Sequence, residues 1–218
     1  MPIQSAAKRK ATYLRWRRQW KVLLTDIEII ALDRHVYRQV TAMIDANPGL
    51  QVPSTFYDWM RRVYVTNMTS AIRRLVDWDT RTISLIRLME EIRDQPEVIS
   101  RRRFAGRYRG VVRGLYHGDF ERFARPGADK IDPGVIRLQR RGLLEAHGRL
   151  RTFVNKHVAH RARHPMVRLP TYAELDKCVD LLEQLAKEYS LLLEAEGLTD
   201  VVPVIQYDWK APFRIPWI

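Results

Sequence analysis

Cysteine is almost absent from this chain of 218 residues, which contains only Cys178. A single cysteine excludes an internal disulfide bond and a zinc site with four cysteine ligands. Such sparse use of cysteine fits a reducing compartment, and we expect a cytoplasmic protein. Cys178 lies between Leu175 and Leu182 in a helical pattern, so its side chain is expected to pack rather than to act as a nucleophile.

Long apolar runs and glycine-rich loops are also missing. No stretch approaches the length of a membrane span, and the basic N-terminus has no apolar signal-peptide core, so no membrane partner is expected. The chain has no phosphate-binding loop of the P-loop or Rossmann type and no Gly-x-Ser-x-Gly turn. The sequence therefore predicts no cofactor and gives no support to nucleotide-dependent or serine-hydrolase chemistry.

Acidic residues are few relative to basic ones. The 38 Lys and Arg residues exceed the 25 Asp and Glu residues by 13, and the pI is about 10.2. Because the excess is clustered, it favours RNA or another nucleic acid as the partner, although a solvated basic surface is the simpler alternative. The apolar content of 46% is enough for a core within one domain.

The hydrophobic spacing is helical nearly throughout and predicts an all-α, up-and-down bundle. We expect a basic, aromatic segment over 1–24, a helical domain over 25–200 and an extended tail over 201–218 that packs on the bundle. Helix starts are indicated by the capping-box patterns at Thr25 and Thr171, by Pro53-Ser54, by Asp79-Thr80 and by Asp132-Pro133. The Asp79-Thr80 junction can equally be a kink in one long helix, and Gly197 is expected to end the last helix.

Residues 95–131 form a basic insertion in this pattern. Four glycines at intervals of four residues weaken any helix, so we expect irregular structure with one short helix. The aromatic residues of the insertion either stack on bases or anchor it to the body, and anchoring is the simpler interpretation. Its candidate phosphate-binding residues are Arg101, Arg102 and Arg103.

Two histidines near the end of the helix that starts at Asp132 are the strongest candidates for chemistry. His157 and His160 can move a proton at an RNA 2′-hydroxyl or leaving oxygen, and Asn155 can orient an imidazole. The phosphate charge can be offset by Arg151 and Arg161. The alternative is that these are ordinary polar residues at a helix C-terminus. A metal site with His164 is not expected, because Pro165 interrupts the helix and no carboxylate or cysteine adjoins.

Arg73 and Arg74 are a second candidate pair. Arg73 and Asp77 stand four residues apart, so they can form an ion pair that braces the bundle. The functional alternative is that one of the two arginines lines a phosphate pocket, and both interpretations can hold together.

Three segments in this order resemble the HEPN superfamily, and the closest branch is the AbiU-like domain of abortive infection. They are Arg73–Asp77, Thr82–Leu88 and Asn155–Arg161, and the tail from Asp208 to Trp217 is similar to tails of that branch. The resemblance implies a helical bundle, a homodimer and, in many members, a metal-independent endoribonuclease used as a toxin or antiphage effector. It also implies an antitoxin or defence partner. Other members have lost catalysis and only bind nucleotides, RNA or a partner.

The chain departs from this family at one position. The family site is an arginine followed by four to six residues and a histidine, and the resemblance places that arginine at Val154 and its histidine at His160. Valine cannot donate to a phosphate. Three interpretations remain. The pair Arg151 and His157, which has the same spacing, can replace the family pair. The missing charge can instead come from Arg73, Arg74 or Arg161, or catalysis is lost. The leading hypothesis is an RNA-directed endoribonuclease, and the alternative is a non-catalytic binding module.

Overall fold

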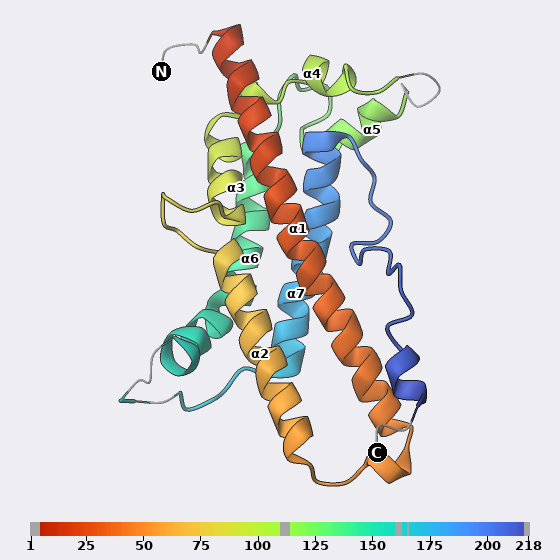
Figure 1. The fold of residues 1–218 in the computed structure, drawn as a ribbon. Helices are drawn as coiled ribbons and strands as arrows, with labels where there is room; N and C mark the ends of the chain where they lie inside the picture. The colour runs from red at the N-terminus through yellow and green to blue at the C-terminus, as the bar shows by residue number, and fades with distance from the viewer. Residues whose placement is uncertain (1–4, 110–113, 160–162, 165, 216–218) are drawn as a thin grey trace.

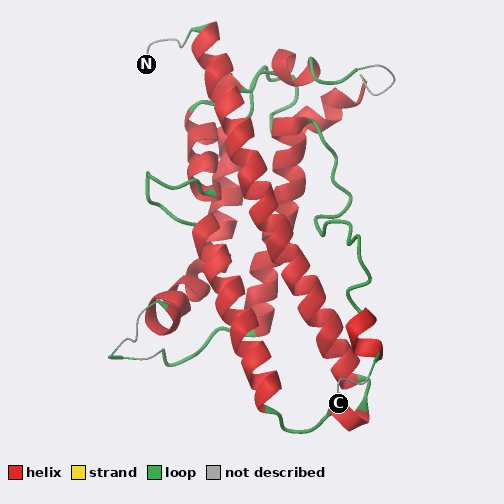
Figure 2. Ribbon diagram, viewed as in Figure 1, coloured by secondary structure: helices red, strands yellow, loops and turns green. Residues whose placement is uncertain are grey.

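The computed structural model describes residues 5–109, 114–159, 163–164 and 166–215. In this part of the chain the structure is helical and contains no β-strand (Figure 2). Long helices that lie along one another form the body (Figure 1): α1 (Ala6–Asp45), α2 (Thr55–Leu75), α6 (Pro133–Phe153) and α7 (Tyr172–Glu194). The shorter α3 (Leu85–Asp94) follows α2 along the same side and packs on α6. The expected all-α bundle is therefore confirmed. None of the described helices is both long enough and apolar enough to cross a membrane.

Helix α1 is continuous over 40 residues, which corresponds to a length of about 60 Å. The predicted helix start at Thr25 is therefore wrong. The Thr25 hydroxyl donates to the Lys21 carbonyl within the helix at 3.1 Å and caps nothing. The helix extends toward the N-terminus because Trp16 and Trp20 are fully buried. Burial of two large aromatic side chains outweighs a local capping signal, which contributes only about 1 kcal/mol.

The core is centred on the contact between α1 and α7. The Trp20 indole N–H donates to the Ser190 hydroxyl at 3.3 Å, and its ring lies 5.7 Å from that of Tyr189. Farther along, the buried Arg34 side chain pairs with Asp180 and Glu183. Two carboxylates thus offset the cost of removing one guanidinium from water.

Several predicted helix starts are confirmed. Ser54 accepts from Phe56 N, and Asp132 accepts from Gly134 N at 2.7 Å ahead of Pro133. Thr171 and Glu174 form the complete capping box of α7. The end of α7 differs from the prediction, because the left-handed residue that terminates it is Ala195 (φ 55°) and not Gly197.

The junction after α2 is a real break rather than a kink. Residues 76–84 leave the helical path between Leu75 and Leu85. The Ser84 hydroxyl donates to the Asp77 carbonyl at 2.6 Å and also caps α3, accepting from Arg87 N. The third helix therefore begins after Ser84 and not at Asp79-Thr80.

The insertion has more regular structure than expected. It contains the turn η2 (Pro96–Val98) and two short helices, α4 (Arg101–Ala105) and α5 (Tyr116–Glu121). The prediction of a single short helix is therefore wrong. The rings of Phe104, Phe120 and Phe123 are buried, and the first two lie 5.3 Å apart. These aromatic residues anchor the insertion to the body, as the simpler interpretation proposed.

The tail leaves α7 and runs back along the bundle (Figure 1). Val201 is buried, and the Lys210 amine donates to the Gln39 side chain at 2.6 Å before the turn η5 (Ala211–Arg214). Between these points Val204 and Tyr207 are exposed. The tail is therefore attached at two places and contributes little to the core between them.

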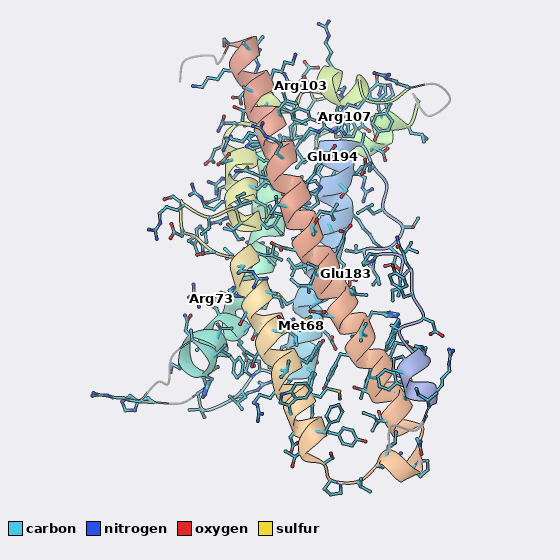
Figure 3. All side chains as sticks on the ribbon, in the orientation of Figure 1. Met68, Arg73, Arg103, Arg107, Glu183 and Glu194 are labelled. Atoms are coloured by element: carbon cyan, nitrogen blue, oxygen red, sulfur yellow. The ribbon has the colours of Figure 1, made fainter. Side chains whose placement is uncertain are left out.

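Glu194 at the end of α7 joins three parts of the fold (Figure 3). Its carboxylate, only 7% exposed, accepts from Arg17 of α1 and from Arg107 of the insertion at 3.5 Å. Arg107 also donates to the Tyr13 hydroxyl at 2.8 Å, and that hydroxyl donates to the Leu193 carbonyl. Two largely covered arginines therefore depend on one carboxylate.

Replacing this carboxylate is expected to destabilise the protein. Glu194→Gln keeps the size of the side chain but leaves Arg17 and Arg107 without their counter-charge, so the free energy of unfolding should fall by about 3 kcal/mol. Glu145→Gln is the matched control, because the Glu145–Arg141 pair is exposed, and the expected change is below about 0.5 kcal/mol. Urea denaturation measures both, and equal losses in the two variants would contradict this role of Glu194.

Candidate functional site

The helix that carries the histidine candidates changes its winding where they occur. α6 continues as η4, a π-helical turn over Val154–Val158, in which Ala159 N donates to the Val154 carbonyl at 2.8 Å. A π-turn adds a residue to the turn and is often found at functional sites. Here it leaves Val154 buried, at 2% exposure, and Asn155 and His157 exposed. The helix that was expected to run toward His160 is present through Val158, but its last five residues have π-helical winding.

Two predicted site residues, His160 and Arg161, lie outside the described residues. The described candidates of this cluster are Arg151, Asn155 and His157. The structure brings them to the same end of α6 but joins none of them to another by a hydrogen bond or ion pair.

His157 is exposed but fixed in orientation. Its ring stacks on Phe153 with centroids 5.5 Å apart, and Met166 N donates to its Nε2 atom at 3.3 Å. A neutral imidazole that accepts at Nε2 carries its proton on Nδ1. In this geometry the Nδ1–H group is the one available to donate a hydrogen bond to a phosphate or leaving oxygen. Neither Phe153 nor Met166 was recognised from the sequence, where only residue type and spacing were visible.

The second arginine pair lies beside this turn. Arg73 and Arg74 are exposed on the last turn of α2, which packs against η4 (Figure 3). The predicted ion pair between Arg73 and Asp77 is not formed among the described residues. Asp77 instead accepts from Asp79 N at 3.2 Å in the turn that follows α2. Arg73 is therefore not held by the carboxylate that the sequence assigned to it.

Arg73 and Arg151 both act on a buried histidine that sequence reasoning missed. His147 is 2% exposed, and within the described structure its Nε2 atom has no hydrogen-bond partner. Burial, followed by the positive charges of Arg151 and Arg73, lowers the pKa of His147 to about 4. Its spacing from Leu143 and Leu150 would have placed it on the buried face of α6. His147 is thus neutral near pH 7, and it shows that arginines of α2 and α6 lie close enough to share one electrostatic environment.

Other arginines near the turn differ in their freedom to bind a ligand. Arg149 pairs with Glu174 at 2.5 Å, and Arg168 lies 3.7 Å from the same carboxylate. Because Glu174 also caps α7, its own hydrogen bonds to Thr171 and these arginines lower its pKa. Arg151, Arg73 and Arg74 form no ion pair within the described residues, so each of them is available to a ligand at this end, as is Lys156 of η4.

Arg101, Arg102 and Arg103 lie at the other end of the bundle, as the separation of Arg103 from Arg73 in Figure 3 illustrates. Arg101 donates to the Ala128 carbonyl at 2.9 Å and covers the Phe120 ring. Arg103 donates to the Val98 carbonyl and lies over the Tyr13 ring. Only Arg102 extends into solvent without such contacts. The candidate residues therefore form two separate groups rather than one site.

Two further expectations concern metal and thiol chemistry. Among the described residues, no three or more His, Cys, Asp or Glu side chains are grouped so as to hold a metal ion. Cys178 is buried, as expected, and burial raises the pKa of its thiol to about 12. A thiolate nucleophile at this position is therefore unfavourable at neutral pH.

The chain matches the model of a known protein family. The model of the HEPN_AbiU2 family, described as AbiU2, matches residues 13–210. Searches of the curated proteins and of the solved structures found no match.

The low pKa of His147 predicts a specific loss of stability in acid. The folded pKa is about 4 and the ordinary value is 6.5. Between these values the unfolded chain binds a proton that the folded protein does not, so stability falls as the pH drops from 6.5 to 4, by about 3 kcal/mol in total. His147→Leu removes the titrating group and the unpaired buried nitrogen.

Urea denaturation at pH 7 and at pH 4.5 tests this prediction. The loss of unfolding free energy between the two pH values should be smaller in His147→Leu than in the wild type by about 2 kcal/mol. His35→Leu on α1 is the control for a general effect of removing a histidine. The same pH dependence in the wild type and in His147→Leu would show that His147 does not titrate abnormally.

Proposed function

The chain belongs to the HEPN_AbiU2 family, whose model matches residues 13–210, and from this premise we propose an RNA-directed protein that acts at the η4 turn. The proposed activity is metal-independent cleavage of RNA, in bacterial defence or in a toxin–antitoxin pair. The observation that carries the proposal is the exposed, oriented His157 at the same end of the bundle as Arg151 and Arg73. The proposed partners are RNA, a second copy of the chain and an antitoxin or defence protein.

The chemistry follows from the residues of this end. RNA cleavage without a metal needs a group that takes the 2′-hydroxyl proton, one that returns a proton to the 5′-oxygen, and a cation at the phosphate. While Met166 N donates to Nε2, His157 offers only a hydrogen bond from Nδ1–H. After Met166 N releases Nε2, this atom can take the 2′-hydroxyl proton, and the imidazolium so formed can return a proton to the 5′-oxygen. Arg151, Arg73 and Arg74 are the guanidinium groups proposed to bind the phosphate.

A second copy of the chain is proposed to complete the site. Within the described part of one chain, no arginine hydrogen-bonds to His157 or to Asn155. The family resemblance implies that arginine and histidine are paired across a dimer, and such an arrangement would bring a second His157 and a second Arg151 to the same phosphate. It would also supply a separate acid and base. His160 and Arg161 are additional candidates for these roles.

One observation favours the alternative, a catalytically inactive module that binds RNA or nucleotide. Val154 is almost completely buried in η4. The residue at the expected arginine position is therefore part of the packing and leaves no cation there. If no other arginine takes its place, the same basic end would hold a phosphate of the RNA without cleaving the RNA.

His157→Ala is expected to separate these two functions. In the presence of EDTA, the wild-type protein should cleave single-stranded RNA, and the variant should cleave it about 10² to 10⁴ times more slowly because proton transfer is lost. Arg151→Ala should also reduce the rate, through loss of phosphate binding. Gel analysis of a labelled RNA measures both effects.

His35→Ala, on α1 and away from η4, is the matched control and should cleave at the wild-type rate. The nuclease hypothesis would be rejected in favour of the binding module by two results together. The wild-type protein would leave the RNA intact, and Arg151→Ala would weaken RNA binding. Equal rates for the wild type and His157→Ala would reject His157 as the proton donor.

A further inference from the structure

A second basic site in the described structure lies at the end opposite to His157. It is an open cleft of about 930 Å³ between the first turns of α1 and the insertion. Five basic side chains and two acidic ones line it, which leaves a net charge of +3. The basic residues are Arg9, Arg102, Arg103, Arg107 and Lys130, and the acidic ones are Glu97 and Asp129.

The walls of this cleft are held by internal contacts. Ser100 and Lys130 form an antiparallel bridge, and Arg101 N donates to the Asp129 carbonyl at 2.7 Å. Arg103 joins the insertion to α1, because its guanidinium donates to the Arg9 carbonyl at 3.3 Å and to the Val98 carbonyl. Arg103 therefore fixes the shape of the cleft, and so does Arg107 through Glu194 and Tyr13. A shape fixed before binding reduces the entropy that a ligand must remove.

Two other cations of the cleft are available to a ligand. Arg102 and Lys130 are exposed, and their side chains form no hydrogen bond or ion pair within the described residues. The Ser100–Lys130 bridge holds the backbone segments that carry them next to each other. Glu97 and Asp129 are exposed in the same cleft and oppose an anion. An anion with several charged groups can engage both cations while keeping away from these carboxylates.

The insertion offers little for reading bases at this place. Its Phe104, Phe120 and Phe123 rings are buried in the body, so they provide no stacking surface. Among the described residues that line the cleft, none is aromatic. Contacts to phosphates fix the position of a nucleic acid without carrying information on its sequence.

We propose that this cleft binds the phosphodiester backbone of single-stranded RNA through Arg102 and Lys130, without base preference. The proposal rests on the proposed RNA-directed function and adds a second RNA contact to it. The two contacts are separated by the 21 residues of α6, which correspond to about 32 Å. At about 3.4 Å per stacked nucleotide, a strand reaches from one to the other over roughly nine nucleotides.

The test uses the full chain with His157→Ala, so that the labelled RNA stays intact. Fluorescence anisotropy measures the affinity for 20-nucleotide homopolymers over a series of salt concentrations. Adding Arg102→Ala and Lys130→Ala should weaken binding about tenfold. It should also reduce the slope of log K against log salt by about 1.4, because each lost phosphate contact on a single strand contributes about 0.7. Glu97→Gln with Asp129→Asn should strengthen binding.

Three controls keep the result specific. Lys21→Ala removes an exposed charge of α1 outside the cleft and should leave the slope unchanged. Thermal unfolding of the Arg102/Lys130 double variant should match that of its parent, because surface substitutions rarely change stability by more than about 0.5 kcal/mol. The third control compares RNA lengths. An RNA of eight nucleotides held in the cleft is too short to reach the other end, which requires about nine nucleotides. Arg151→Ala should therefore reduce the affinity for the octamer less than the affinity for the 20-mer.

The outcomes separate this proposal from the proposed function. An unchanged affinity and slope in the double variant would overturn the cleft as an RNA site, even if wild-type protein cleaves RNA. A reduced slope, together with RNA that stays intact after incubation with the wild-type protein, would support the cleft and reject the nuclease. A preference of about 100-fold for one homopolymer, or displacement by a mononucleotide at equal phosphate concentration, would overturn backbone recognition. No RNA binding by the parent protein would overturn both proposals.

Discussion

The carboxylate of Glu194 determines how the insertion and the first turns of α1 are assembled on the end of α7. It lies at the end of α7, accepts from Arg17 of α1 and from Arg107 of the insertion, and is itself almost fully covered. A buried charge network is stable only when each group keeps its partner. Because Arg107 also reaches Tyr13, the same network fixes the insertion against the first turns of α1. The form of the basic cleft therefore depends on the ion pair between Glu194 and Arg107, one of the residues that line it.

The two ends of the molecule are built differently. At the cleft, most arginines are used to hold the backbone, and few charges are left for a partner. At η4, the arginines of α2 and α6 are exposed, and the histidine is oriented by one ring and one backbone N–H group. A rigid cleft suits a contact that positions a polymer. The exposed groups at η4 do not hydrogen-bond to one another within the described part of one chain. Such an arrangement suits a site that forms only when a second chain or an RNA binds there.

Local signals in the sequence were reliable where short-range contacts determine structure. Asp132-Pro133 and the capping box at Thr171 gave correct helix starts, because a cap depends on residues two or three positions away. The signal at Thr25 failed because Trp16 and Trp20 find their hydrogen-bond partners on α3 and α7, 75 and 170 residues later. The end of α7 at Ala195 and the burial of Val154 likewise follow from tertiary packing.

The candidate site was less predictable than the fold. Spacing along a regular helix does not describe η4, because the π-turn changes which residues share a face. The effect of Arg73 on His147 and the contact of Arg103 with Arg9 involve segments distant in sequence. The partners of His157 are near in sequence but depend on the winding of η4 and on the turn that carries Met166. The family resemblance was confirmed over residues 13–210, but a family does not determine which arginine replaces the one missing at Val154.

The proposed nuclease site and the proposed cleft site together require RNA to contact this protein at both ends of α6. The most direct measurement is photo-crosslinking of a 20-nucleotide RNA containing 4-thiouridine to the full chain, with mass spectrometry of the linked peptides. We expect adducts in two groups, around residues 151–168 and around residues 100–109 and 128–130. Adducts in only one group, or on the apolar outer face of α2 that carries Phe56 and Trp59, would contradict it.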